Sequence, residues 1–187
     1  MAKPATLIEA PIPPLEPGDH LTRDEFERRY DAMPGLKKAE LIEGVVYLSS
    51  PVRWDHHARP HIDVSTWLGV YAAHTPGVQV GDNGSVRLDG GNMPQPDVAM
   101  MIDPALGGQA VIGEDDYIEF VFGQGQYERL QPGPDGIHRS EVFPGLWLDA
   151  TALAAFDLAR VLDVLGVGVA GPDHGDFVAR LAGLAAG

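Results

Sequence analysis

Residues 96–102 read Pro-Asp-Val-Ala-Met-Met-Ile, a Pro-Asp pair followed directly by five apolar residues. A short, continuous apolar run is typical of a buried β-strand. Asp97 would therefore stand at the start of a strand, where a rigid element can hold a carboxylate against a divalent cation. The alternative interpretation is a loop-end aspartate that caps backbone groups.

The residues before this run alternate between helix and strand signals. Thr22 followed by Glu25 is a capping box, which predicts a helix through about Met33. Residues 40–48 predict a strand with Gly44 at a turn or bulge. Residues 57–74 predict an amphipathic helix, because their apolar residues recur at helical spacing.

The residues around and after the run continue this mixed pattern. Residues 78–88 predict two strand pieces joined as a hairpin by Asp82-Asn83-Gly84. The later expectations are a loop at 103–116, strands within 117–130 around Gly123-Gln124-Gly125, a strand at 137–143, one helix from Asp149 or Thr151 through Leu165, and a last helix from Gly171 to about Leu184. This order of elements indicates an α/β or α+β domain.

Length, charge and composition limit the classes of protein to which this chain can belong. The chain has 187 residues and a net charge of −14, which favours one domain over residues 19–187 behind a Pro-rich, extended arm at residues 1–18. The absence of cysteine excludes disulfides and thiolate catalysis. The acidity argues against tight non-specific binding to nucleic acid, although an acidic nuclease that uses Mg²⁺ to approach phosphate stays open. No apolar run is long enough to span a membrane and no leader is visible, so a cytoplasmic protein is expected.

Acidic and imidazole side chains supply the other candidates for chemistry. Glu40 and Glu43 frame the first expected strand, where solvated strand-end charges are the simpler interpretation. His57 and His61 are i, i+4 neighbours beside His56 and share a helical stripe with Val64 and Leu68, and this spacing can bind a metal. A pair at the edge of a core, hydrogen-bonded to backbone or a carboxylate, is the alternative. No phosphate-binding loop and no G-x-S-x-G motif is present.

Several strings, in this order, resemble the Uma-two family of restriction-endonuclease-like proteins. They are residues 40–47, residues 49–51, His57, residues 96–98, residues 127–130 and residues 143–148. The resemblance covers about residues 20–165. The family belongs to the PD-(D/E)xK nuclease superfamily, which implies an α/β fold with a central mixed sheet flanked by helices.

The resemblance also implies a chemistry, namely Mg²⁺-dependent (or Mn²⁺-dependent) hydrolysis of DNA phosphodiesters. Asp97 matches the carboxylate of the Pro-Asp pair and Glu40 matches the glutamate of the opening strand, so both are expected metal ligands. His57 matches a histidine that is common where the long helix begins.

The sequence departs from this pattern after Asp97. The only lysines are Lys3, Lys37 and Lys38, and no Asp or Glu after Asp97 has Lys, Arg or Gln two residues later. Only residues 120–126 join two regions that the family separates by the (D/E)xK strand, a helix and a further strand. We therefore expect a fold that lacks a central strand and helix, with newly exposed sheet edges.

Three hypotheses follow. The chain is a restriction-endonuclease-like protein with weak or no DNA cleavage, or a non-catalytic binding module that self-associates through exposed sheet edges. The third is a small metal protein that uses His57, His61 and Asp97.

Overall fold

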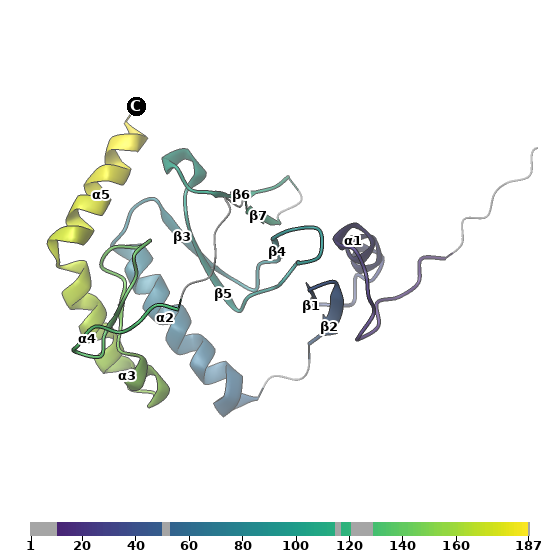
Figure 1. Ribbon diagram of the computed structural model, residues 1–187, viewed down its shortest axis with the longest axis horizontal. Coiled ribbons are helices and arrows are strands. Elements are labelled where there is room, and N and C mark those ends of the chain that lie inside the picture. Colours follow the sequence, from purple (N-terminus) through teal and green to yellow (C-terminus); the bar gives the residue numbers. More distant parts are fainter. Residues whose placement is uncertain (1–10, 50–52, 115–116, 121–128, 187) are drawn as a thin grey trace, which may run out of the picture. The chain divides into compact units, whose positions relative to one another are not determined.

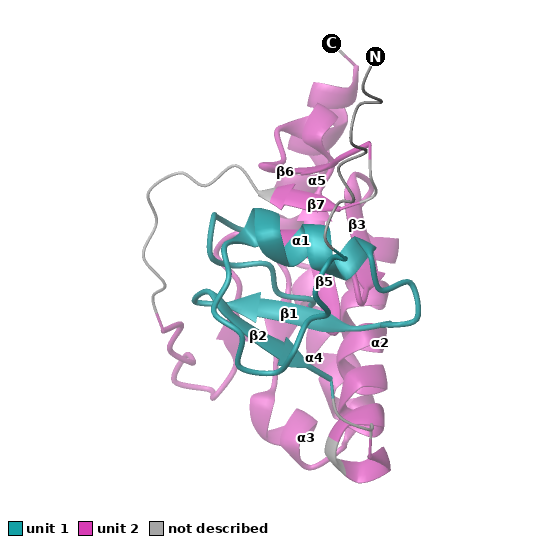
Figure 2. Cartoon of the chain, turned by 90° about the vertical axis from the view of Figure 1, so that its right-hand side faces the viewer, with its two compact units in different colours: residues 1–50, 88–95 teal, residues 51–87, 96–187 magenta. Residues whose placement is uncertain are grey.

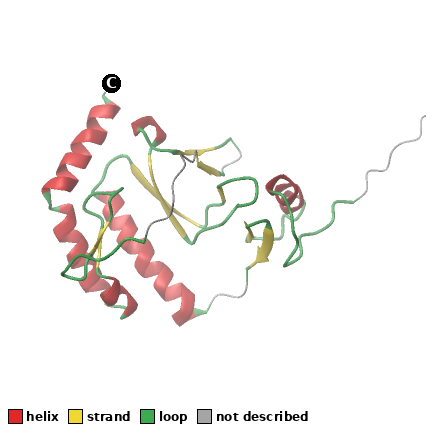
Figure 3. Cartoon of the chain, in the orientation of Figure 1, coloured by secondary structure: helices red, strands yellow, loops and turns green. Residues whose placement is uncertain are grey.

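The computed structural model describes residues 11–49, 53–114, 117–120 and 129–186, and its helices and strands are drawn in Figures 1 and 3. The chain divides into two compact units. Unit 1 comprises residues 1–50 and 88–95, and unit 2 comprises residues 51–87 and 96–187 (Figure 2). The features expected at residues 1–10, 123–125 and 127–128 lie outside the described residues. The expectation of one domain over residues 19–187 stays a prediction.

Unit 1 contains one helix and one hairpin: α1 (Arg23–Asp31), β1 (Ala39–Ile42) and β2 (Val45–Leu48). The Thr22 side chain accepts the Glu25 N–H, which confirms the predicted start of the helix. β1 and β2 pair antiparallel, with Ile42 opposite Val45. The residues between them, Glu43 and Gly44, both have positive φ, as a tight hairpin turn requires. The strand expected at residues 40–48 is therefore a hairpin, and the turn expected at Gly44 is confirmed.

Two flanking segments pack onto this hairpin. The backbones of Leu41 and Met93 exchange hydrogen bonds, which joins residues 88–95 to β1. Residues 11–18 form neither helix nor strand, but Leu15 is buried and the Gly18 N–H donates to the Val46 carbonyl at 2.9 Å. The end of the expected arm is thus held in unit 1.

Unit 2 contains the remaining helices and strands. They are η1 (Trp54–Ala58), α2 (Arg59–Ala73), β3 (Val78–Asp82), β4 (Val86–Arg87), β5 (Val98–Ile102), η2 (Pro104–Leu106), β6 (Ala110–Ile112), β7 (Ile118–Phe120), β8 (His138–Arg139), β9 (Trp147–Leu148), α3 (Ala150–Ala154), α4 (Leu158–Val169) and α5 (Pro172–Ala185). The helix expected at residues 57–74 and the strand expected after Asp97 are confirmed. No described helix has the length and apolarity needed to cross a membrane.

The strand pairing in unit 2 differs from the expected hairpin. β3 pairs antiparallel with β5, whereas β4 pairs in parallel with β7, which also pairs with β6. The hairpin predicted around Asn83 is therefore wrong: the turn is present, but its two strands enter different sheets. Residues 103–116 are also not a continuous loop, because they hold η2 and β6. The strand expected at 137–143 is limited to β8, which pairs with β9.

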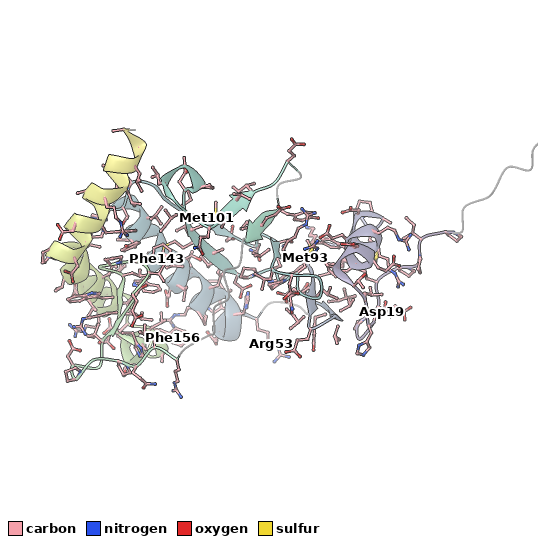
Figure 4. All side chains as sticks on the ribbon, turned by 45° about the horizontal axis from the view of Figure 1, so that its top comes forward. Asp19, Arg53, Met93, Met101, Phe143 and Phe156 are labelled. Atoms are coloured by element: carbon pink, nitrogen blue, oxygen red, sulfur yellow. The ribbon has the colours of Figure 1, made fainter. Side chains whose placement is uncertain are left out.

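The helix expected from Asp149 through Leu165 is broken into α3 and α4. Phe156 has φ 58°, a left-handed conformation that ends a helix. Each part has its own N-cap, because Asp149 accepts the Ala152 N–H and Asp157 accepts the Arg160 N–H. Phe156 is labelled in Figure 4.

The core of unit 2 lies between its helices and one face of the β3–β5 pair. Its buried members are Tyr71, Val78, Leu146, Leu165, Phe177 and Leu181, with Met100 and Ile102 of β5 packed against them. Helices α2, α4 and α5 lie together on this side (Figure 1). The described residues therefore form a mixed α/β fold, as predicted, whose strands make several small sheets.

Candidate functional site

Asp97 immediately precedes β5 and is held through its backbone by two other elements. Its carbonyl oxygen accepts the Asn83 N–H at 3.3 Å, from the turn after β3. The same oxygen lies 3.0 Å from Nε2 of His61, on α2. A carbonyl oxygen can only accept, so His61 carries a proton on Nε2. The start of β5 is thus fixed by both the neighbouring strand and the helix that covers it.

The Asp97 side chain faces the imidazole of His57. Nε2 of His57 lies 3.6 Å from Oδ1 of Asp97, and the two side chains are 38% and 41% exposed. The rings of His57 and His61 are 5.8 Å apart between centroids. The structure therefore brings together three residues that the sequence singled out, and the interpretation of the histidines as hydrogen-bonded partners of backbone and carboxylate is confirmed for His61.

The local sequence explains where His57 stands. Pro60 lies in the first turn of α2 and has no N–H to donate. The regular α-helical hydrogen bonds therefore cannot continue through Pro60 toward the N-terminus. The turn before it is a π turn, in which the Ala58 N–H donates to the Arg53 carbonyl and the Arg59 N–H to the Trp54 carbonyl. Single π turns are uncommon and occur often at functional sites.

These residues line a pocket of about 410 Å³. Its walls are His57, Pro60, His61, Val64, Asp97 and Val98. Val64 lies on the helical stripe that the sequence predicted to contain both histidines. Asn83 was missed as a support of the site, because the Asp-Asn-Gly signal was interpreted as a simple hairpin turn. The pocket is open to solvent and combines a carboxylate, an imidazole and apolar walls.

Glu40, the other expected ligand, lies on β1 in unit 1. Its Oε1 accepts the Gln95 N–H at 2.8 Å, so it anchors the backbone two residues before Asp97 in the chain. Glu40 is half-buried and hydrogen-bonded, which differs from the simpler interpretation of a solvated strand-end charge. Glu43 matches that interpretation, because it lies in the exposed turn.

No metal-binding cluster is found among the described residues: no three His, Asp or Glu side chains gather in a way that could hold an ion. His57, His61 and Asp97 do not form one as they stand, because Nε2 of His61 is bound to the Asp97 carbonyl. The side chain of His56 lies outside the described residues.

Comparison with known proteins identifies the family. The mixed α/β fold of the described residues agrees with the fold class that the resemblance implies. The model of the Uma2 family, described as "Putative restriction endonuclease", matches residues 23–122, more than half of the chain. The chain therefore belongs to the Uma2 family, and the expected family is confirmed. No curated protein matches the chain. The resemblance noted at residues 127–130 and 143–148 lies beyond the matched region and stays a prediction.

Proposed function

We propose that this chain is a restriction-endonuclease-like protein whose Mg²⁺-dependent DNA cleavage is weak or absent. Membership of the Uma2 family supports a nuclease-like function. The observation that carries the second half of the proposal is the lack of the (D/E)xK motif. No lysine follows Lys38, and no acidic residue after Asp97 is followed two positions later by a basic residue.

The described donor set does not fit a complete Mg²⁺ site. Mg²⁺ requires near-octahedral oxygen coordination, and in this family's chemistry it would polarise the phosphate and activate water. The group that faces Oδ1 of Asp97 at 3.6 Å is the imidazole of His57, and no cluster of three donors is present among the described residues.

The roles of the chain's own residues follow from this. We propose Asp97 and Glu40 as the remaining carboxylates of the family site, with DNA as the substrate of any residual activity. Within unit 1, Oε1 of Glu40 is held by the Gln95 N–H. His57 would act beside Asp97, in the lining of the same pocket.

Plasmid nicking tests this proposal directly. Supercoiled DNA is incubated with the full chain and Mg²⁺ or Mn²⁺, beside Asp97→Ala and Glu40→Ala. Glu43→Ala is the matched control, because Glu43 is an exposed acid of the same hairpin. We expect the same background in all four proteins. Cleavage by the natural chain that disappears in Asp97→Ala but persists in Glu43→Ala would refute the loss of activity.

A second candidate function is self-association through a sheet edge, without catalysis. Among the described residues β6 has one neighbouring strand, β7, and so forms an edge of its sheet. Val111 and Ile112 on this edge are 37% and 52% exposed. An exposed apolar edge strand is a template for pairing with another chain.

Size-exclusion chromatography with light scattering tests this second candidate. Self-association should be lost in Ile112→Lys, because a charge on an edge strand opposes pairing. Leu184→Lys is a control, since Leu184 is equally exposed at 52% but lies on α5. A natural chain that is monomeric at all accessible concentrations would exclude pairing through β6.

A further inference from the structure

The segment that leads into α2 carries a strongly exposed aromatic side chain. Trp54, the first residue of η1, is 75% exposed, the highest value among the large apolar side chains of the described residues. Its indole makes no hydrogen bond and no ring contact within the part of the chain that the structure describes. Trp67, in contrast, donates through its indole N–H to the Trp147 carbonyl at 2.9 Å. Trp54 therefore leaves its ring open to a binding partner.

Two exposed arginines flank Trp54. Arg53 precedes it and Arg59 begins α2, and among the described residues neither forms an ion pair. The exposed Asp55 lies between them in the chain and pairs with neither. Six other arginines are paired with carboxylates: Arg23, Arg28, Arg29, Arg87, Arg139 and Arg160. Arg53 and Arg59 thus offer guanidinium groups to an anionic partner, and phosphate suits the planar guanidinium well.

Arg59 is also held in place by an aromatic ring. Its guanidinium carbon lies 4.4 Å from the centroid of Phe156, the residue at the break between α3 and α4. Such stacking orients the guanidinium plane and leaves its N–H groups to an acceptor, because the ring contacts only the face of the group. Arg53 and Phe156 are labelled in Figure 4. One of the two cations is therefore positioned before any ligand binds.

We infer that Arg53, Trp54 and Arg59 bind an unpaired nucleic-acid strand, with a base stacked on Trp54 and phosphates on the two arginines. Aromatic rings that take base faces, beside cations that take phosphates, are how proteins bind single strands without reading their sequence. Bases inside a duplex are covered by their neighbours, so this surface should favour unpaired nucleotides. The inference rests on the proposed function in taking nucleic acid as the partner, and it names the form of that partner.

The position of the surface in unit 2 agrees with this form. His57 follows Trp54 by three residues and Pro60 follows Arg59 directly, and both line the pocket that contains Asp97. A strand that is stacked on Trp54 and bound by Arg59 would therefore pass beside this pocket.

The net charge of −14 shapes how such binding should behave. An acidic chain repels phosphate at long range, so many phosphate contacts are not expected, whereas stacking does not depend on charge. With two arginine contacts, the logarithm of the binding constant should fall with the logarithm of salt concentration with a slope of about −1.4. Loss of either arginine should reduce the size of this slope by about 0.7.

Fluorescence anisotropy of a labelled oligothymidylate of about twelve nucleotides, with the full chain in EDTA, tests the inference. The natural chain should bind this strand more tightly than a duplex of the same length. Trp54→Ala should weaken binding about five- to a hundredfold, the usual effect of losing one stacked base, and Trp54→Phe should retain most of the affinity. An oligouridylate of the same length shows whether RNA is bound equally.

Two variants serve as matched controls. Arg180→Ala removes an exposed arginine that also lies over an aromatic ring, at 5.1 Å from the Phe177 centroid on α5. Val167→Ala removes an apolar side chain that is 63% exposed on α4. Both should bind like the natural chain, in affinity and in salt dependence.

Three results would overturn the inference: no binding of the single strand, tighter binding of the duplex, or equal affinity in the natural chain and Trp54→Ala. Circular dichroism checks that the variants are folded. Because EDTA removes divalent cations, binding is measured without cleavage. The result is therefore separate from the plasmid assay, in which only cleavage that depends on Asp97 decides the proposed function.

Discussion

Nε2 of His61 donates to the backbone carbonyl oxygen of Asp97 at 3.0 Å, across 36 positions of sequence. This bond ties the long helix α2 to the first residue before β5. It also fixes which nitrogen of His61 carries the proton, because the carbonyl can only accept. The carboxylate that the family resemblance selects is therefore held by its own backbone, which leaves its side chain to face His57.

Removal of this bond should lower stability. His61→Ala should reduce the free energy of unfolding by about 1 kcal/mol, the usual net value of such a bond. His61→Gln should restore part of that free energy, because its amide can donate to the same carbonyl. Urea unfolding compares the natural chain with the two variants. Equal losses in His61→Ala and His61→Gln would show that donation to the Asp97 carbonyl does not contribute to stability.

A glycine on α4 gives a prediction about packing. A Cβ on Gly168 would collide with the carbonyl oxygen of Gly145 and lie 2.8 Å from Cγ of Trp147. Gly168→Ala should therefore lower the free energy of unfolding by about 1–3 kcal/mol, as overpacking does. Gly166→Ala in the same helix meets open space, so it should be neutral or stabilising by up to about 1 kcal/mol. Parallel urea titrations compare the two variants, and equal effects would contradict the close approach at Gly168.

The elements that the sequence predicts well are those fixed by local chemistry. The N-cap at Thr22, the periodicity of α2 and the start of α5 after Gly171 depend on neighbours in the chain. The break at Phe156 escaped prediction because apolar spacing continues across it. The turn at Asn83 was assigned correctly, but the partners of its strands depend on tertiary pairing, which overrides the hairpin signal.

The site was predicted in parts but not as an assembly. Helical spacing placed His57, His61 and Val64 on one stripe, and the Pro-Asp pair marked the start of a strand. The local sequence does not indicate which strand packs against that stripe, because the contact between His61 and Asp97 spans 36 positions and depends on the tertiary fold. The absence of the (D/E)xK motif, in contrast, is visible in the sequence alone.

The buried side chain of Tyr71 should make the free energy of unfolding depend on pH in the alkaline range. Tyr71 is completely buried and donates to the Pro144 carbonyl at 2.9 Å, and burial raises the pKa of Tyr71 to about 12. An unfolded tyrosine ionises near pH 10. Between these two pH values the tyrosine of the unfolded state loses its proton before that of the folded state. The contribution of Tyr71 to the free energy of unfolding is therefore fully present below about pH 10 and is lost as the pH rises to about 12.

The corresponding loss of unfolding free energy is of the order of 2–3 kcal/mol, from two units of pKa difference. Tyr71→Phe is the comparison, because it cannot ionise. It should be less stable at neutral pH by about 1 kcal/mol through the lost hydrogen bond, and its stability should fall less steeply above pH 10. Parallel slopes for the two proteins above pH 10 would show that Tyr71 does not ionise differently on folding.

A buried hydrogen bond between Thr75, two residues after the end of α2, and His174 joins this end of α2 to α5. The Thr75 hydroxyl donates to the Tyr71 carbonyl at 2.8 Å and lies 2.9 Å from Nε2 of His174. Its single proton is used on the carbonyl, so His174 must donate through Nε2. Thr75 is completely buried and His174 is 5% exposed. Loss of either side chain would therefore leave the polar group of the other buried, with neither a hydrogen-bond partner nor water.

Thr75→Val should therefore cost about 1–3 kcal/mol of unfolding free energy, the penalty for an unsatisfied buried donor. Thr66→Val is the matched control, because Thr66 makes the same bond to the carbonyl four residues earlier, at 2.7 Å to Ile62, on the exposed side of the helix. Its effect should stay within about 0.5 kcal/mol. The double variant Thr75→Val with His174→Phe removes both partners, so it should lose less than the sum of the two single changes. Additive losses, measured by urea unfolding, would mean that the two residues stabilise the fold independently, and that the contact between α2 and α5 depends on apolar packing alone.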